Sequence, residues 1–106
     1  MAEINTNPGE IFRAKINLET SKIAWSELQR FFAGGKALMV SVDLDLVETA
    51  FQISEDNAEQ VRQWMLSGKL VRVPVEQARE WFETDALVWA VVVSPWVLVQ
   101  PIARLH

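Results

Sequence analysis

The sequence predicts an α+β fold, in which a small mixed or antiparallel sheet of about four to five strands has helices packed against it. The chain has 106 residues, half of them hydrophobic, which is enough for one core and too few for two. Apolar residues recur at helical spacing in several segments before residue 84. Two nearly continuous apolar runs, Leu87–Val93 and 96–99, have the length and valine content of buried central strands. Together these features favour one domain over residues 10–106.

The N-terminal third is predicted to hold a flexible arm and two helices. Residues 1–9 form the arm in this interpretation, with a turn at residues 7–9. A helix over residues 10–18 is predicted by the spacing of Ile11, Ala14 and Leu18. A second helix over residues 25–33 would end at two glycines, and its apolar face would hold Trp25, Leu28, Phe31 and Phe32.

Residues 37–54 contain one clear strand and one ambiguous segment. Residues 37–42 are a strand by composition and length. Residues 44–54 fit either a helix capped by Asp43 or a strand, because apolar and polar residues alternate over 47–54. The alternation favours the strand, which would form a hairpin with residues 37–42.

The second half of the chain is predicted to alternate helices with strands. Asp56 and Glu59 suit a capping box for a helix that buries Val61, Trp64 and Met65 and ends at residues 67–68. A short strand over residues 70–73 follows. Pro74 suits the first position of the next helix, whose inward residues would be Ala78, Trp81 and Phe82. Pro95 forces a bend between the two apolar runs because it has no N–H to donate to a strand ladder.

Charge and missing residue types exclude several function classes. The net charge is −4, and the ten Lys and Arg residues are scattered with no two adjacent. Nucleic-acid and anionic-membrane binding both depend on clustered basic residues, so we expect neither partner. The chain has no cysteine and one histidine, His106, which excludes thiol chemistry and His-ligated metal sites. We therefore expect no cofactor, and any metal would be a hard cation held by carboxylates.

The location expected from the sequence is the cytoplasm. Residues 1–10 lack the basic and apolar regions of a signal peptide. Residues 86–103 carry no charge, which is near the lower limit for a membrane span. Their valine content and the prolines at 95 and 101 favour a buried strand pair instead.

Acidic residues form the nearest approach to a catalytic cluster. Asp43, Asp45 and Glu48 are the main candidates, with Glu55 and Asp56 close by in sequence. On a strand, Asp43 and Asp45 would point the same way and could hold Mg²⁺ through water or raise each other's pKa. Turn formation and helix capping also require such residues, and that interpretation is favoured.

Two other motifs also favour structural roles over functional ones. The order helix, Gly34-Gly35-Lys36, strand is the reverse of a phosphate loop and favours a helix C-cap. Ser94 has no evident base to activate it and favours a bend.

Five tryptophans without any tyrosine are the most unusual feature of the composition. Trp25, Trp64, Trp81 and Trp89 are assigned mainly to the core. A domain of this size has difficulty burying five indoles, so at least one is expected in a pocket or interface, where tryptophan is enriched. The candidates for a pocket or interface are Trp96, Trp89 and Trp25, together with the polar residue Gln100. Of these, Trp96 is favoured to meet a partner.

Most of the chain from residue 19 to residue 100 resembles a known family. The matching stretches are residues 23–34, residues 44–48, Glu55-Asp56 with Trp64, and residues 87–100, of which the last is the most specific. They resemble short bacterial proteins grouped as domain of unknown function 2288. The resemblance implies an intracellular bacterial protein and supplies no activity, cofactor or site residue.

These observations leave two hypotheses for function. The first is a non-enzymatic interaction module that forms a homo-oligomer, because the apolar run from residue 87 to residue 99 and the tryptophans exceed what one small sheet readily covers. The second is a small-ligand-binding protein or weak Mg²⁺-type hydrolase with a tryptophan-lined pocket.

Overall fold

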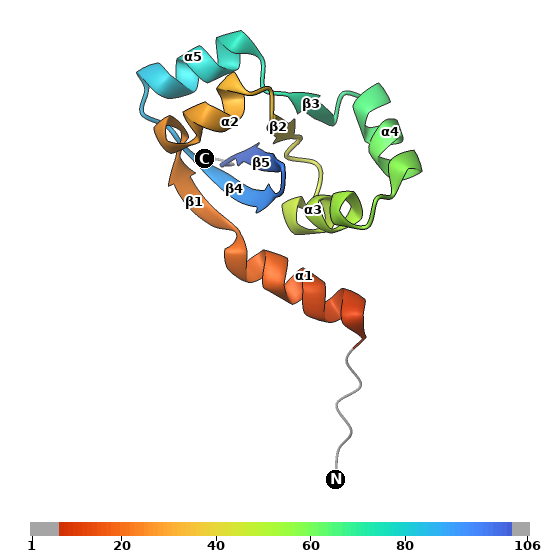
Figure 1. The fold of residues 1–106 in the computed structure, drawn as a ribbon. Coiled ribbons are helices and arrows are strands. Elements are labelled where there is room, and N and C mark those ends of the chain that lie inside the picture. The colour runs from red at the N-terminus through yellow and green to blue at the C-terminus, as the bar shows by residue number, and fades with distance from the viewer. Residues whose placement is uncertain (1–6, 103–106) are drawn as a thin grey trace.

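A five-stranded mixed sheet forms the middle layer of the computed structural model, which describes residues 7–102 (Figure 1). The strands are β1 (Ser21–Ala24), β2 (Ala37–Val40), β3 (Leu70–Arg72), β4 (Leu87–Val93) and β5 (Trp96–Pro101), in the spatial order β1-β4-β5-β2-β3. The pair β5–β2 is parallel and the other neighbouring pairs are antiparallel. The predicted α+β class is therefore confirmed.

The two apolar runs lie in the interior of this sheet, as predicted. β4 and β5 form a hairpin in register from Val93–Trp96 to Val88–Pro101, and Ser94 and Pro95 connect them. Central strands are covered on both faces and so can be apolar at successive positions. Val97, Leu98 and Val99 are accordingly all fully buried.

One face of the sheet packs against a 3-10 turn and two helices, η1 (Trp25–Leu28), α2 (Gln29–Ala33) and α5 (Val75–Glu83). Trp25 is completely buried there, and its ring centroid lies 5.1 Å from that of Trp81. Within residues 7–102, the Trp25 Nε1 atom is buried without a hydrogen-bond partner. Both indoles are core residues, in agreement with their predicted assignment.

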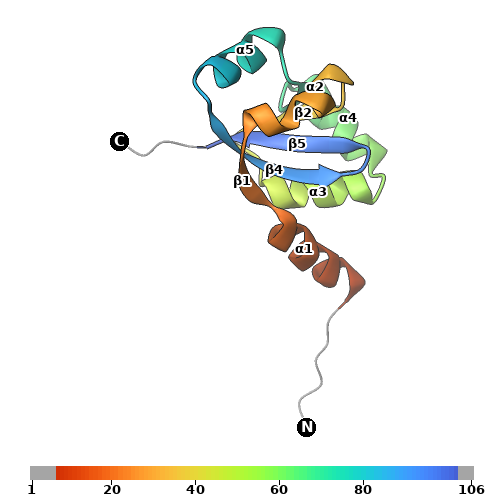
Figure 2. The same cartoon turned by 60° about the vertical axis from the view of Figure 1, so that its left-hand side comes forward.

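The opposite face packs against α1 (Pro8–Glu19), α3 (Leu46–Ser54) and α4 (Ala58–Leu66). Figure 2 shows α1 and α3 below the sheet and α2 and α5 above it. Val91 and Leu98 face this layer and contact residues such as Ala50 and Phe51 of α3. The fold is thus a three-layer arrangement with the sheet in the middle.

The prediction of a strand over residues 44–54 is wrong, because this segment contains helix α3. Its true apolar stripe begins at Leu46 and continues at Thr49, Ala50 and Ile53, which is helical spacing that buries both odd and even positions. Asp45, not Asp43, caps the helix by accepting a hydrogen bond from the Glu48 amide. The antiparallel partner of β2 is instead β3, which follows α3 and α4 in the chain.

Smaller corrections concern the helix ends near residues 8 and 57. Asn7 caps α1, and Pro8 occupies its first turn, so the predicted turn at residues 7–9 is wrong. The part of the expected arm at residues 1–6 lies outside the described residues. Asn57 caps α4 in place of the predicted Asp56, which has a positive φ of 55°. Strand β1 has no counterpart among the elements that the sequence predicts.

Two helix residues expected in the core lie at the surface. Met65 of α4 is 56% exposed and Phe82 of α5 is 60% exposed. Each follows a more buried tryptophan in sequence, so the helix turns it away from the sheet. Gly34 caps α2 and Gly35 has a φ of 71°, which confirms the C-cap interpretation. Over residues 7–102, no helix has the length and apolar content needed to cross a bilayer.

Candidate functional site

The three acidic candidates lie close in sequence but have separate partners. Asp45 accepts a hydrogen bond from the Glu48 amide at 2.9 Å, and Asp43 lies 3.8 Å from the Lys69 ammonium. Glu48 forms a two-point ion pair with Arg13 of α1, at 2.7 and 3.2 Å. Because α3 is a helix, Asp43 and Asp45 do not share a strand face. In the described range, 7–102, no three acidic or histidine side chains are arranged to hold a metal ion.

Glu48 is the acidic candidate with a perturbed electrostatic environment. Its Oε1 atom accepts a hydrogen bond from Arg13 at 3.2 Å and a second from Gln52 Nε2 at 2.9 Å. The hydrogen bonds from Arg13 and then Gln52 lower the pKa of the Glu48 carboxyl below its ordinary value. A lowered pKa keeps this group ionised, which suits an ion-pair partner and not a general acid.

Trp89 and Trp96 lie at opposite ends of the β4–β5 hairpin. Trp96 pairs with Val93 beside the turn, whereas Trp89 pairs with Gln100 near the far end. Each indole is half-buried with a lysine ammonium above its ring, Lys22 at 5.2 Å from Trp89 and Lys36 at 4.8 Å from Trp96. The two tryptophans therefore do not line one common pocket.

Gln100 and Trp25 have structural partners that account for their positions. The Gln100 side-chain amide donates to the carbonyl oxygens of Ser41 and Leu44, both at 2.8 Å. It thereby fixes the loop that leads from β2 into α3. Trp25 has no exposed surface, so its ring is not accessible to a partner.

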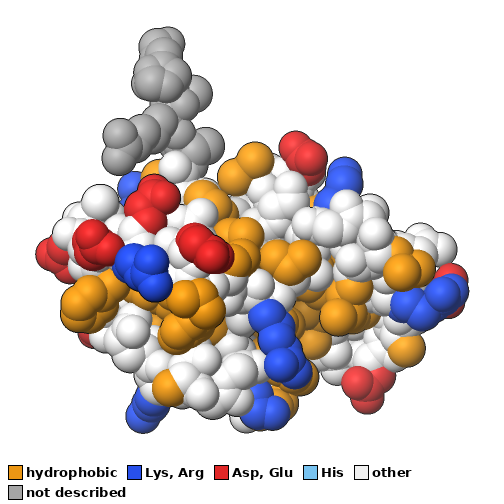
Figure 3. All heavy atoms as spheres, turned by 90° about the horizontal axis from the view of Figure 1, so that it is seen from above, with side chains coloured by type: hydrophobic (Ala, Val, Ile, Leu, Met, Phe, Trp, Pro, Cys, Tyr) orange, Lys and Arg blue, Asp and Glu red, His pale blue; other side chains and the backbone are white. Residues whose placement is uncertain are grey.

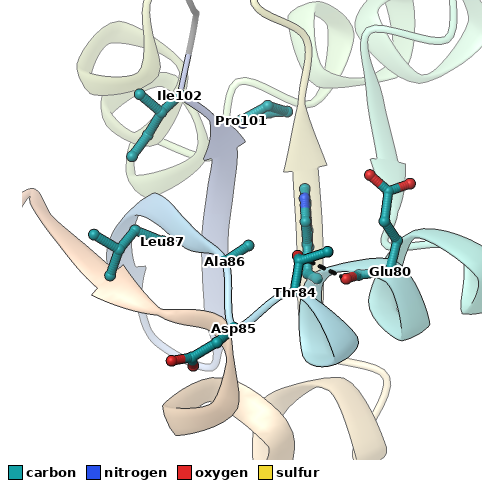
Figure 4. Close-up of a pocket in the computed structure, with 8 residues that line it drawn as sticks. Glu80, Thr84, Asp85, Ala86, Leu87, Pro101 and Ile102 are labelled. Carbon is teal, nitrogen blue, oxygen red and sulfur yellow. Dashed lines mark hydrogen bonds between the residues drawn. The ribbon is translucent and has the colours of Figure 1, made fainter.

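A cavity of about 620 Å³ lies where α5 meets the ends of β4 and β5 (Figure 4). Its lining includes two carboxylates, Glu80 and Asp85, together with Trp81 and Leu87. Figure 4 shows the two carboxylates on opposite sides, with Thr84 and Ala86 between them. They do not converge on a common point, and thus they do not form the acid–base pair that a hydrolase requires.

The outward face of α1 exposes apolar side chains, and we define Ile11, Ala14 and Leu18 as the α1 stripe. Leu18 is 84% exposed and Ile11 is 57% exposed. Ile16, on the opposite side of the helix, is the residue of α1 that is buried. Spacings of three, four and seven residues place the α1 stripe along one line on the helix surface. Within residues 7–102, this helix consequently has an apolar face that no other element covers.

Other apolar residues lie beside the α1 stripe. Phe12 is 40% exposed, and with Ile16 it lines a cleft of about 300 Å³ between α1 and the β4–β5 turn. Val92, which is 52% exposed, lies on the far wall of the same cleft. The exposed apolar surface of α1 thus extends toward the hairpin turn.

A second apolar surface lies on the opposite side of the sheet. Val75 and Phe82 of α5, each 60% exposed, border a cleft of about 270 Å³ with Phe32 of α2. Figure 3 views this side of the molecule and shows apolar side chains gathered between charged ones. Arg79 also lines this cleft, as Lys15 lines the cleft beside Phe12.

Comparison with known proteins assigns the family. A family described as "Protein of unknown function (DUF2288)" matches residues 11–101. The chain belongs to the DUF2288 family. The NMR solution structure of PA1075 from Pseudomonas aeruginosa is 41% identical, with a TM-score of 0.77, over 99% of this chain and 100% of that one. No curated protein matches the chain.

The family assignment confirms the predicted resemblance. The part of the chain that matches DUF2288 begins at Ile11 and so includes most of α1, with the whole α1 stripe. The description of the family carries no activity or ligand over to this chain. Sequence reasoning identified the spacing of the α1 stripe, but helical spacing alone does not tell which side of a helix faces the core.

Proposed function

We propose that this DUF2288 protein is a non-enzymatic interaction module that associates with a second copy of itself through the α1 stripe. The observation that carries the proposal is the exposure of Leu18, 84%, on a helix whose buried residue lies on the opposite side. Contiguous exposed apolar surface of this kind is a mark of interaction sites. The α1 stripe takes the place of Trp96 as the favoured contact because Trp96 is half-buried and has the Lys36 ammonium above its ring.

A second copy is the favoured occupant because the α1 stripe is complementary to itself. The small Ala14 lies between the larger Ile11 and Leu18. When two copies of α1 cross in antiparallel orientation about a two-fold axis, Ile11 of one meets Leu18 of the other. Ala14 then faces its own copy and allows close approach. Two-fold interfaces require this kind of self-complementary patch.

The size of α1 limits the strength of such a dimer. A helix of 12 residues is about 18 Å long. Two crossed helices of that length bury less than the roughly 800 Å² per partner of a standard stable complex. We therefore expect a dimer that dissociates in the range of about 10–100 μM, corresponding to about −5.5 to −7 kcal/mol.

The ligand-binding or hydrolase alternative has weaker support. Its proposed anchors Asp43, Asp45 and Glu48 each have a structural partner, as described above. The 620 Å³ cavity adds only two separated carboxylates. An interaction role requires only exposed apolar side chains, and the α1 stripe supplies them.

Sedimentation velocity over a concentration series tests the proposal. Leu18→Glu places a charge in the α1 stripe and is expected to abolish association. Leu66→Glu is the matched control, because Leu66 of α4 is also strongly exposed, at 75%, and lies outside the proposed contact. Association that survives Leu18→Glu, or a wild-type protein that stays monomeric up to about 500 μM, would overturn the proposal.

A further inference from the structure

Helix α1 is attached to the rest of the fold by a small set of contacts. Ile16 is its buried residue, and the Phe12 ring meets the edge of the Phe51 ring at a centroid distance of 6.1 Å. The Arg13 guanidinium lies 4.0 Å from the centroid of the same Phe51 ring. It also holds Glu48 through two hydrogen bonds. Arg13 therefore makes both polar and aromatic contacts with α3.

The Arg13–Glu48 pair belongs to a longer line of hydrogen bonds. Gln52 donates to Glu48 at 2.9 Å, and Asn57 donates to the Gln52 side-chain oxygen at 2.8 Å. Asn57 in turn accepts a hydrogen bond from a backbone amide in the first turn of α4, where it is the N-cap. One polar chain thus connects α1 through α3 to the start of α4. It fixes the carboxylate that Arg13 binds.

These contacts determine which side of α1 faces solvent. Arg13 and Ile16 are three residues apart and so lie on neighbouring parts of one helix side. Anchoring both against α3 and the sheet sets the rotation of the helix about its axis. The α1 stripe then necessarily faces outward. A helix of this length is marginal on its own in water, so α1 without its anchors would lose both position and helical structure.

We propose that the Arg13–Glu48 pair is a latch that holds α1 in the orientation in which the α1 stripe can bind a second copy. This inference rests on the proposed function, because it names the regulation of the same surface. Only the latched form is competent to associate, so the apparent affinity falls with the latched fraction. Arg13 and Glu48 are positioning residues that lie outside the α1 stripe.

Hydrogen exchange in the monomeric background Leu18→Glu tests the latch separately from association. Arg13→Ala removes the ion pair and the ring contact, and it is expected to speed exchange of the α1 amides about tenfold or more. Glu48→Gln keeps a neutral hydrogen-bond acceptor and is expected to speed it about two- to fivefold. Exchange in β4 and β5 is expected to stay unchanged in both variants.

Glu59→Gln provides the matched control. Glu59 forms a surface ion pair with Arg62 at 2.9 Å inside α4, with no link to α1. Its replacement is expected to leave α1 exchange unchanged. If Arg13→Ala and Glu48→Gln also leave α1 exchange unchanged, the latch is wrong while the proposed self-association stands. If α1 exchange responds but Leu18→Glu still dimerises, the proposed contact is wrong, and the role of the latch in association is overturned with it, while the pair remains an anchor of α1.

Measuring association of Arg13→Ala, without the Leu18→Glu change, connects the latch with the proposed self-association. Arg13→Ala is expected to raise the dissociation constant by at least the factor by which it lowers the latched fraction. An unchanged dissociation constant, measured with accelerated α1 exchange, would show that latching does not control the contact and would overturn the inference.

Discussion

Replacing Trp96 with alanine discriminates between the two places at which a second copy could bind. Trp96 is half-buried on β5, pairs with Val93, and has the Lys36 ammonium 4.8 Å above its ring. Removing a wholly buried Trp costs about 3–5 kcal/mol. Because the Trp96 ring is only half-buried, its removal costs only part of that free energy. Loss of the lysine contact adds about 0.5–1 kcal/mol. We expect Trp96→Ala to destabilise the monomer by about 2–3 kcal/mol.

The measurement combines unfolding with association. Urea unfolding followed by far-ultraviolet circular dichroism reports stability without depending on the removed fluorophore. Trp81→Ala is the reference, because Trp81 is only 7% exposed and is expected to cost about 3–5 kcal/mol. Sedimentation velocity at matched concentrations is expected to give the wild-type dissociation constant for Trp96→Ala. A monomeric Trp96→Ala protein with wild-type stability would refute this reasoning and place the contact at the hairpin instead of α1.

Three further predictions follow from the contacts of the candidate residues. Asp45→Ala removes the cap of α3 and is expected to lower the unfolding free energy by about 1 kcal/mol. Asp43→Ala is expected to change it by less than about 0.5 kcal/mol. Equal losses for the two variants in urea unfolding would contradict this expectation. Gln100→Ala removes the side-chain donor from the Ser41 and Leu44 carbonyls, of which the Ser41 carbonyl keeps the Leu44 amide, and is expected to cost about 1–3 kcal/mol in the same assay. Because Arg13 holds the pKa of Glu48 below its ordinary value of 4.5, the ion pair stabilises the fold above that pH and the contribution disappears as pH falls through the lowered pKa; the difference in melting temperature between wild type and Glu48→Gln should vanish in acid, and a constant difference would argue against the pair.

Local signals predicted much of the fold correctly. The β4–β5 hairpin, the helix that begins beside Pro74 and the glycine cap after α2 each depend on neighbouring residues and a short apolar pattern. The strand prediction for residues 44–54 is wrong because the segment contains both an alternating pattern and a helical stripe. The position of Leu46, outside the alternating residues, would have favoured the helix.

Non-local contacts explain what the sequence did not predict. Strand β1 has only four residues, its first two are exposed, and its pairing partner is β4, more than 60 residues away. The candidate site has the same character. The spacing of the α1 stripe was visible, but its outward direction depends on Arg13 meeting Glu48 of α3, 35 residues later. Single-sequence periodicity contains no information about such a pairing.

The central position of the β4–β5 hairpin has a consequence for synthesis on the ribosome. Both β1 and β2 pair with strands of this hairpin, and both core clusters include its residues. The earlier elements therefore lack their main packing surface until residues 87–101 have left the exit tunnel. Long-range pairing of this kind slows folding and prolongs the exposure of apolar segments. Apolar segments of the nascent chain therefore stay without this packing surface until the hairpin emerges, and we expect cooperative folding to begin only then.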